Sequence, residues 1–230
     1  MNRDPRMAMT VIFPGQDFEG SIFNTLDQTL PGGGNNQNYP LVADNASKTA
    51  LTWAKYLAPM SQYPDIWDTD ACPIVFRYAE VLLSFAEASN ELTGPSGDVY
   101  DILDDIRQRV NMPVVDRTKY NSKESLRELI RRERGVEFAG EGLRRADIIR
   151  WKDSSGKMVA ETVLNGPLYR VIGTVNHNEA DVYKRATIDI NASAEDRLVE
   201  NRQFLPIHRY LPIPQSSIDK NPNLKQNTGY

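Results

Sequence analysis

Cysteine and histidine are scarce in this sequence, and their scarcity excludes several classes of site. Cys72 is the single cysteine, and His177 and His208 are the two histidines. One cysteine cannot close an intramolecular disulfide or supply a thiolate metal cluster. The two histidines are widely separated and have no second ligand at helical spacing, which leaves little basis for a histidine metal site or a Ser-His-Asp triad. We therefore expect no metal and no other cofactor.

Long apolar runs and blocks of one charge sign are also missing. No stretch approaches the run of about twenty apolar residues that a membrane-spanning helix needs. The N-terminal stretch MNRDPRMAMT lacks the apolar core and cleavage site of a signal peptide. The net charge of -4 comes from mixed charges, which argues against nucleic acid or an anionic membrane surface as the main partner. A hydrophobic content of 40% in 230 residues predicts a globular protein.

The first part of the chain is rich in turn-forming residues. The stretch PGGGNNQN, residues 31–38, combines glycines, which adopt positive φ, with asparagines, whose side chains bond to nearby backbone. We expect long irregular loops over residues 1–71.

A period of about 3.6 residues follows and predicts helices. The stretch GPSGD, residues 94–98, ends one helix and caps the next, so a helical hairpin is expected, with the pitch of a tetratricopeptide-type unit. An ordinary helical hairpin explains the periodicity equally well. A third helix begins after the N-cap residue Ser122, and LRRADIIRW forms a short fourth one. The expected inward stripes of the four helices are Tyr78, Val81, Leu82, Phe85, Ser89 and Leu92; Val99, Ile102, Leu103, Ile106 and Val110; Leu126, Leu129, Ile130 and Phe138; and Leu143, Ala146 and Ile149.

The last third of the chain carries weaker signals. LYRVIGTV and TIDI, residues 168–175 and 187–190, are rich in β-branched residues and predict a small β-hairpin. The C-terminal stretch from Tyr210 has closely spaced prolines and reads as an extended segment with turns. The predicted fold class is therefore mainly α: a tetratricopeptide-like helical hairpin scaffold with long irregular loops and a small β-hairpin. Within residues 1–230 we divide the chain into a loop-rich ligand-side segment, 1–71, a helical core, 72–152, and an irregular C-terminal wrap, 153–230.

Glu133 and Glu137 lie one helical turn apart beside an apolar stripe. Paired carboxylates are the general acid and base of glycosidases. A carboxylate that faces a core must otherwise be paired, and the same segment offers Arg131, Arg132, Arg134, Arg144, Arg145 and Arg150. A catalytic acid needs a raised pKa, which nearby guanidinium groups oppose, so the pattern favours an ion-pair network.

Several separate stretches agree, in order, with one family. They are NRDPRMAMT, WAKY, RYAEVLLSFAEASNEL, IRQRVNMP, ERGVEFAGEGLRRADIIRW and YLPIPQSSIDKNPNLKQNTGY. Together they closely resemble the C-terminal half of the SusD/RagB family of surface glycan-binding lipoproteins. The resemblance covers most of the chain and implies an α-rich protein without enzyme activity. It also implies that a charged framework is structural, which here corresponds to Glu133, Glu137, Glu141, Arg144, Asp147 and Arg150.

The resemblance further implies a location and partners. Members of this family lie at the outer face of the outer membrane, held by a lipid anchor, and cover the barrel of a TonB-dependent, SusC-like transporter to which they deliver oligosaccharides or other nutrients. The chain departs from the family pattern at Gly135 and Gly140, where larger side chains are usual, and at Thr228, which replaces a proline. The family's signal peptide, lipid-bearing cysteine and first half are not in this sequence, and Cys72 lies too deep in the chain to carry the lipid.

Sugar recognition needs flat apolar faces together with groups that bond hydroxyls. Loops that combine both supply the candidate glycan-binding residues, which are Asn38, Tyr39, Tyr63, Asp65, Trp67 and Asp68. Aromatic residues are more often packed in a core, and we assign Trp53, Tyr56 and Trp151 to packing. The leading hypothesis is non-catalytic surface binding of oligosaccharides or related nutrients for a TonB-dependent transporter. The alternatives are a helical protein-interaction scaffold that binds no sugar, and a glycoside hydrolase that uses Glu133 and Glu137.

Overall fold

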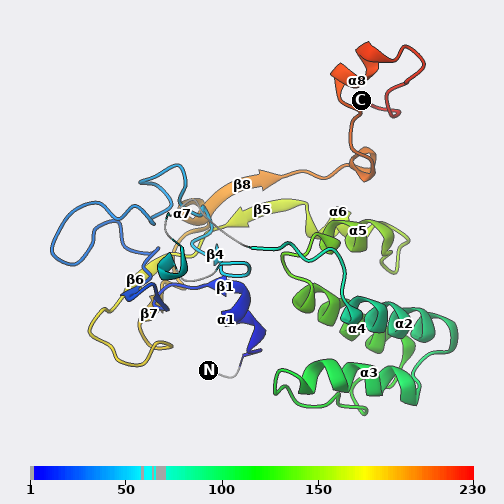
Figure 1. Ribbon diagram of the computed structural model, residues 1–230, viewed down its shortest axis with the longest axis horizontal. Coiled ribbons are helices and arrows are strands. Elements are labelled where there is room, and N and C mark those ends of the chain that lie inside the picture. The colour runs from blue at the N-terminus through cyan, green and yellow to red at the C-terminus, as the bar shows by residue number, and fades with distance from the viewer. Residues whose placement is uncertain (1–2, 58–59, 64, 66–70) are drawn as a thin grey trace. The chain divides into compact units, whose positions relative to one another are not determined.

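The computed structural model describes residues 3–57, 60–63, 65 and 71–230 (Figure 1). The chain forms two compact units, one of residues 1–143 and 171–192 and the other of residues 144–170 and 193–230. Helices predominate and the strands form small two-stranded ribbons, so the predicted mainly α fold class is confirmed. The division at residues 71 and 152 remains a prediction. No helix in the described part of the chain is long and apolar enough to cross a membrane.

Three helices form the centre of the first unit: α2 (Tyr78–Thr93), α3 (Gly97–Gln108) and α4 (Lys123–Glu137). Helix α2 packs against both α3 and α4, and α2 and α3 form the predicted hairpin (Figure 1). The side chain of Ser122 accepts a hydrogen bond from the backbone N–H of Ser125 and so caps α4. The buried core of this unit consists of Leu83, Ala86, Val99, Leu103, Ile106, Val115, Leu126, Leu129, Ile130 and Phe138. The stripes predicted for α3 and α4 are therefore confirmed.

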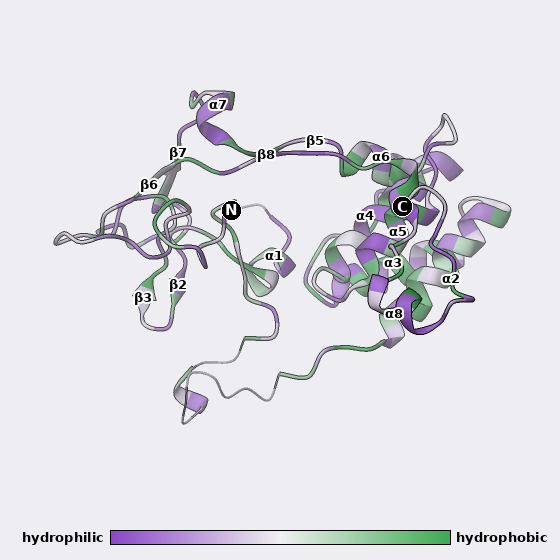
Figure 2. Ribbon diagram, turned by 90° about the horizontal axis from the view of Figure 1, so that it is seen from above, coloured by the Kyte–Doolittle hydropathy of each residue, from purple (hydrophilic) through white to green (hydrophobic). Residues whose placement is uncertain are grey.

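The stripe predicted for α2 is wrong in its facing. Leu83, Ala86 and Asn90 are the buried residues of this helix. Four members of the predicted stripe are instead more than half exposed, and they are Tyr78, Val81, Phe85 and Leu92. Apolar residues are both buried and exposed along this helix, whose colouring in Figure 2 is mixed. Periodicity cannot tell which side meets a neighbour. The side with the small residue Ala86 packs against α3 and α4, since a short side chain lets helices approach closely.

The rest of the first unit is loop-rich, as predicted for residues 1–71. Its short elements are α1 (Arg6–Thr10), β1 (Val11–Ile12), β2 (Asp17–Phe18), β3 (Ser21–Ile22), β4 (Thr52–Trp53), the 3-10 helix η1 (Met60–Gln62), β6 (Gly173–Val175) and β7 (Ala186–Ile188). The antiparallel pairs are β1 with β4, β2 with β3, and β6 with β7. Strand β6 lies at the end of the LYRVIGTV stretch and β7 includes the first two residues of the TIDI stretch, so the predicted small hairpin is present. A small core of Leu26, Ala50 and Val175 supports these loops.

The second unit has its own core. It contains α5 (Leu143–Arg150), whose first residue belongs to the first unit, α6 (Val159–Val163), β5 (Gly166–Tyr169), α7 (Ala194–Arg197), β8 (Leu198–Arg202), the 3-10 helix η2 (Pro206–Arg209) and α8 (Gln215–Lys220). Strands β5 and β8 pair antiparallel. The core consists of Ile148, Trp151, Met158, Ala160 and Phe204.

The facing predicted for α5 needs correction. We expected Leu143, Ala146 and Ile149 to point inward, but Ala146 is exposed and Ile149 is half-buried. The fully buried positions of this helix are Asp147 and Ile148. Trp151 follows Asp147 and Ile148 at helical spacing. Its large indole determines which side of α5 is buried, because it offers the most apolar area.

Candidate functional site

A cluster of buried charges lies at the C-terminal end of α4. Glu133 and Glu137 project from the buried side of the helix, and Glu141 follows in the turn before α5. The side chains of these three glutamates are only 3%, 2% and 3% exposed. A buried carboxylate is costly unless it is paired, so the partners of these groups determine what the site can do.

Arg6 of α1 joins two of the glutamates. Its Nη2 lies 2.8 Å from Oε2 of Glu133, and its Nη1 lies 2.9 Å from Oε2 of Glu137. Asp4 holds the same guanidinium from the other side, with its Oδ2 2.5 Å from Nη2 of Arg6. Arg107, in α3, donates to the second oxygen of Glu133. The N-terminal segment is therefore tied to the helical core through charge-assisted hydrogen bonds.

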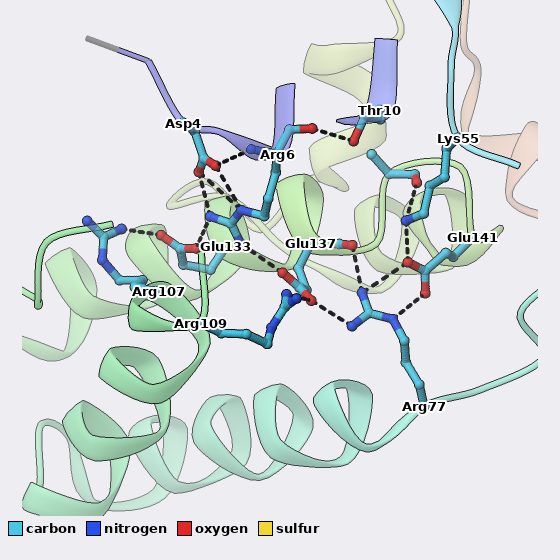
Figure 3. A network of polar contacts seen from close by, with 11 residues as sticks. Asp4, Arg6, Thr10, Lys55, Arg77, Arg107, Arg109, Glu133, Glu137 and Glu141 are labelled. Carbon is cyan, nitrogen blue, oxygen red and sulfur yellow. Dashed lines mark hydrogen bonds and ion pairs between the residues drawn. The ribbon is translucent and has the colours of Figure 1, made fainter. Parts of the chain in front are cut away.

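Arg77 and Lys55 continue the cluster toward Glu141 (Figure 3). Nη1 of Arg77 lies 2.6 Å from Oε1 of Glu137, and its Nε lies 2.8 Å from Oε2 of Glu141. Nζ of Lys55 lies 2.5 Å from Oε1 of Glu141 and also donates to the backbone carbonyl of Ala139 at 3.0 Å. Arg109 adds a further bond to Oε1 of Glu137 at 2.6 Å. Every one of the three glutamates thus has at least two cationic partners.

These contacts keep the carboxylates charged. Burial alone would raise the pKa of Glu137, but hydrogen bonds from Arg77 and Arg6 outweigh burial and hold this pKa below its ordinary value. The pKa of Glu141 is also below its ordinary value, because hydrogen bonds from Arg77 and Lys55 outweigh the effect of burial. A general acid requires the opposite shift, so the geometry gives no support to a glycosidase mechanism at Glu137.

The partners differ from those expected from the sequence. The cations come from Arg6, Lys55, Arg77, Arg107 and Arg109, which are distant in sequence from the glutamates or lie on another helix. The arginines of α4 itself are used elsewhere: Arg131 pairs with Glu128, and Arg134 with Glu87. Arg6, Lys55 and Arg77 lie in the stretches NRDPRMAMT, WAKY and RYAE, and no local pattern in the sequence marks them as partners of the glutamates.

Three members of the expected charge framework, Arg144, Asp147 and Arg150, lie on α5 in the second unit. Asp147 is buried and pairs with Arg150 one turn later at 2.8 Å. Arg144 is exposed, with its guanidinium carbon 5.8 Å from the ring centre of Trp151. The structure thus brings together Glu133, Glu137 and Glu141, and places Arg144, Asp147 and Arg150 around Trp151.

Two of the expected glycan-binding residues lie on an anchored loop. Gly32, Gly33 and Gly34 all have positive φ, as the sequence predicts for a tight turn. The buried Asn36 then fixes the following backbone: its Nδ2 donates to the carbonyls of Asn24 and Asp27, and its Oδ1 accepts from the N–H of Asn38 at 3.0 Å. This arrangement presents Asn38 exposed and Tyr39 half-buried, a defined surface rather than a free loop.

The other candidates follow η1. Tyr63 is half-buried and its N–H donates to the carbonyl of Met60 at 3.0 Å, while Asp65 is exposed. Trp67 and Asp68 lie outside the described residues. The two groups of candidates therefore occupy separate loops of the first unit.

Trp53 departs from its expected role in packing. It lies in β4 and is 55% exposed, whereas Trp151 is buried as predicted and Tyr56 is half-buried. The indole of Trp53 rests on the turn after α4, where a Cβ added to Gly140 would lie 3.4 Å from its Cζ3. The sequence gives no sign of this exposure, because an aromatic residue within a patterned segment is more often packed.

Comparison with known proteins shows the family to which the chain is similar. The model of the SusD family matches residues 1–230. Two SusD-like proteins of Formosa agariphila are similar: protein P25 is 31% identical over 163 residues, 68% of this chain, and protein P38 is 37% identical over 93 residues, 38% of this chain. The chain spans only 24% and 18% of these two relatives.

Solved structures extend the likeness to the fold. A SusD-like carbohydrate-binding protein from Bacteroides fragilis matches 97% of this chain with a TM-score of 0.71 and 29% identity. A second SusD-like protein from the same species matches 99% with a TM-score of 0.70 and 26% identity. The matched regions make up 42% and 39% of those chains. SusD-family binding proteins are non-catalytic, in line with the fully paired glutamates. With its whole length matched by the family model, the chain belongs to the SusD family.

Proposed function

We propose that this chain is part of a cell-surface protein that binds oligosaccharides, or related nutrients, without catalysis. The protein delivers them to a TonB-dependent, SusC-like transporter in the outer membrane. A lipid anchor attaches the protein to the same membrane. The observation that carries the proposal is the likeness of nearly the whole chain to a solved carbohydrate-binding protein, at a TM-score of 0.71 and 29% identity. The paired charges at the end of α4 support it, because Glu133, Glu137 and Glu141 all bond to cations that hold loops on the helices.

The glycan-binding residues we propose are Asn38, Tyr39, Tyr63 and Asp65, together with Trp67 and Asp68. Aromatic rings offer a flat apolar face to the C–H groups of a sugar ring, while amides and carboxylates bond its hydroxyls. Asn36 supports this role for the first loop, because a buried, fully bonded amide fixes the backbone that presents Asn38 and Tyr39. A preorganised loop loses less entropy when it binds a ligand.

A glycan array probed with the purified chain, followed by calorimetry on the best binder, tests this proposal. We expect Tyr39→Ala to weaken binding about tenfold, which corresponds to about 1.4 kcal/mol and is the scale of one aromatic contact. Tyr210→Ala is the matched control, since Tyr210 is exposed but lies in the second unit. Equal affinity of wild type and Tyr39→Ala would remove this loop from the site, and a folded chain that binds no glycan would reject the function.

A second candidate function is a helical protein-interaction scaffold that binds no sugar. One observation favours it: Tyr78, Val81, Phe85 and Leu92 form an exposed apolar row, which we call the outer face of α2. Contiguous exposed apolar residues often mark a protein-binding surface. This function requires that no glycan binds. It also requires that Phe85→Ser reduces self-association of the chain, measured by sedimentation velocity. Glycan binding that Phe85→Ser leaves intact would favour the first proposal.

A further inference from the structure

Trp53 has the features of a sugar-stacking platform rather than of a packed core residue. Strand pairing fixes its backbone, because β4 pairs with β1 with Trp53 opposite Val11, and the N–H of Ala54 donates to the carbonyl of Thr10 at 2.9 Å. The side chain nonetheless remains 55% exposed. A large indole on a fixed backbone, with more than half of its surface in water, is available to contact a ligand.

The surroundings of the ring define which part of it is available. The six-membered ring lies against Gly140, whose φ of 78° and missing side chain let the indole approach the turn after α4. A Cβ at this position would lie 3.4 Å from Cζ3 and 3.7 Å from Cε3 of Trp53. The turn therefore lies against the part of the ring around Cζ3 and Cε3, while more than half of the residue stays exposed.

A fixed donor stands beside the platform. The side chain of Lys55 packs around the same glycine, with its Cδ 3.8 Å from the position of that Cβ. Glu141 and the carbonyl of Ala139 accept two hydrogen bonds from its Nζ. An ammonium group has three N–H donors, so among the contacts of the described residues one donor remains for a hydroxyl group. An apolar face with a fixed donor at its side is the pairing that a pyranose ring requires.

We infer that Trp53, with Lys55, forms a subsite that stacks one neutral sugar ring of a bound oligosaccharide. This inference rests on the proposed function, because it assigns a further contact to the same kind of ligand. It also gives a role to Gly140, whose left-handed backbone with a φ of 78° forms the turn on which the indole rests.

The probes are soluble maltohexaose, cellohexaose, laminarihexaose and xylohexaose, titrated into the purified chain by calorimetry. Trp53→Tyr and Trp53→Leu are compared, since both side chains still cover Gly140 but only tyrosine keeps an aromatic face. We expect Trp53→Leu to weaken the best binder about tenfold and Trp53→Tyr to weaken it less than threefold. A purely structural role would affect the two variants alike.

Nuclear magnetic resonance supplies a second readout. The indole N–H signal of Trp53 is identified by its loss in Trp53→Tyr, and we expect it to shift during titration of wild type. If an oligosaccharide binds but this signal stays in place and Trp53→Leu binds equally well, the subsite is wrong while the proposed function stands. If wild type binds none of the probes or the glycans of the array, both are rejected.

Discussion

At the scale of single residues, Arg6 contributes more to the stability of the fold than its position near the N-terminus suggests. It is buried, and its two terminal nitrogens contact Glu133 and Glu137 while Asp4 holds the same group. Removal of one partner from a buried ion pair leaves an uncompensated charge, which is more damaging than the loss of an exposed pair. Through its contacts with Glu133 and Glu137, Arg6 links the loop-rich segment to α4.

We therefore predict that Arg6→Met lowers the free energy of unfolding by about 3 kcal/mol, the scale of a broken buried pair. Urea denaturation followed by circular dichroism measures it. The control is Lys184→Met, whose ion pair with Asp181 is exposed on both sides and should change stability by less than about 0.5 kcal/mol. Equal effects of the two substitutions would show that Glu133 and Glu137 are satisfied without Arg6.

The lowered pKa values of Glu137 and Glu141 predict acid sensitivity. Each carboxylate is stabilised in the folded state, so its contribution is complete above the ordinary glutamate pKa of about 4.5 and is lost as the pH falls through the lower folded value. The urea midpoint should therefore fall steeply below about pH 4.5. Glu137→Gln should be less stable than wild type at pH 7 and lose less on acidification. An identical pH slope in the variant would exclude Glu137 as a source of this dependence.

At the scale of elements, α2 shows what a sequence pattern can and cannot determine. The helix, its end at Gly94 and the hairpin with α3 follow from periodicity and turn chemistry, and the structure confirms them. Its facing does not follow, because Leu83 and Ala86 on one side and Val81 and Phe85 on another are equally apolar. Only the neighbours α3 and α4 decide between the sides, and their position is a tertiary property.

A pair of neighbouring substitutions tests this facing. Leu83→Ala should cost about 3 kcal/mol in unfolding free energy, because the side chain is fully buried in the core and leaves a cavity. Phe85→Ala, two positions away, removes a larger side chain that is 53% exposed, and it should cost less than about 1 kcal/mol. The reverse order in thermal or urea denaturation would restore the facing predicted from the sequence.

At the scale of the whole molecule, the two compact units are interleaved along the chain. The ribbon of β5 and β8 belongs to the second unit, yet the segment between these strands contains β6 and β7 of the first unit. Sequence patterns describe local structure, so they point to β6 and β7 but neither to β8 nor to this nesting. The same limit hid the charge cluster, whose glutamates were predictable while Arg6, Lys55 and Arg77 are brought to them only by the fold.

Because each unit has its own core, damage to one should stay within it. Trp151 packs with Met158 and Phe204 in the second unit, and Trp151→Ala should cost about 3–5 kcal/mol there. We expect amide hydrogen exchange to accelerate over residues 144–170 and 193–230 while the amides of α2, α3 and α4 keep their protection, because contacts within a unit set its local stability. Leu83→Ala serves as the reciprocal control and should affect the helices of the first unit. Faster exchange in both units after either substitution would show that they unfold as one cooperative body.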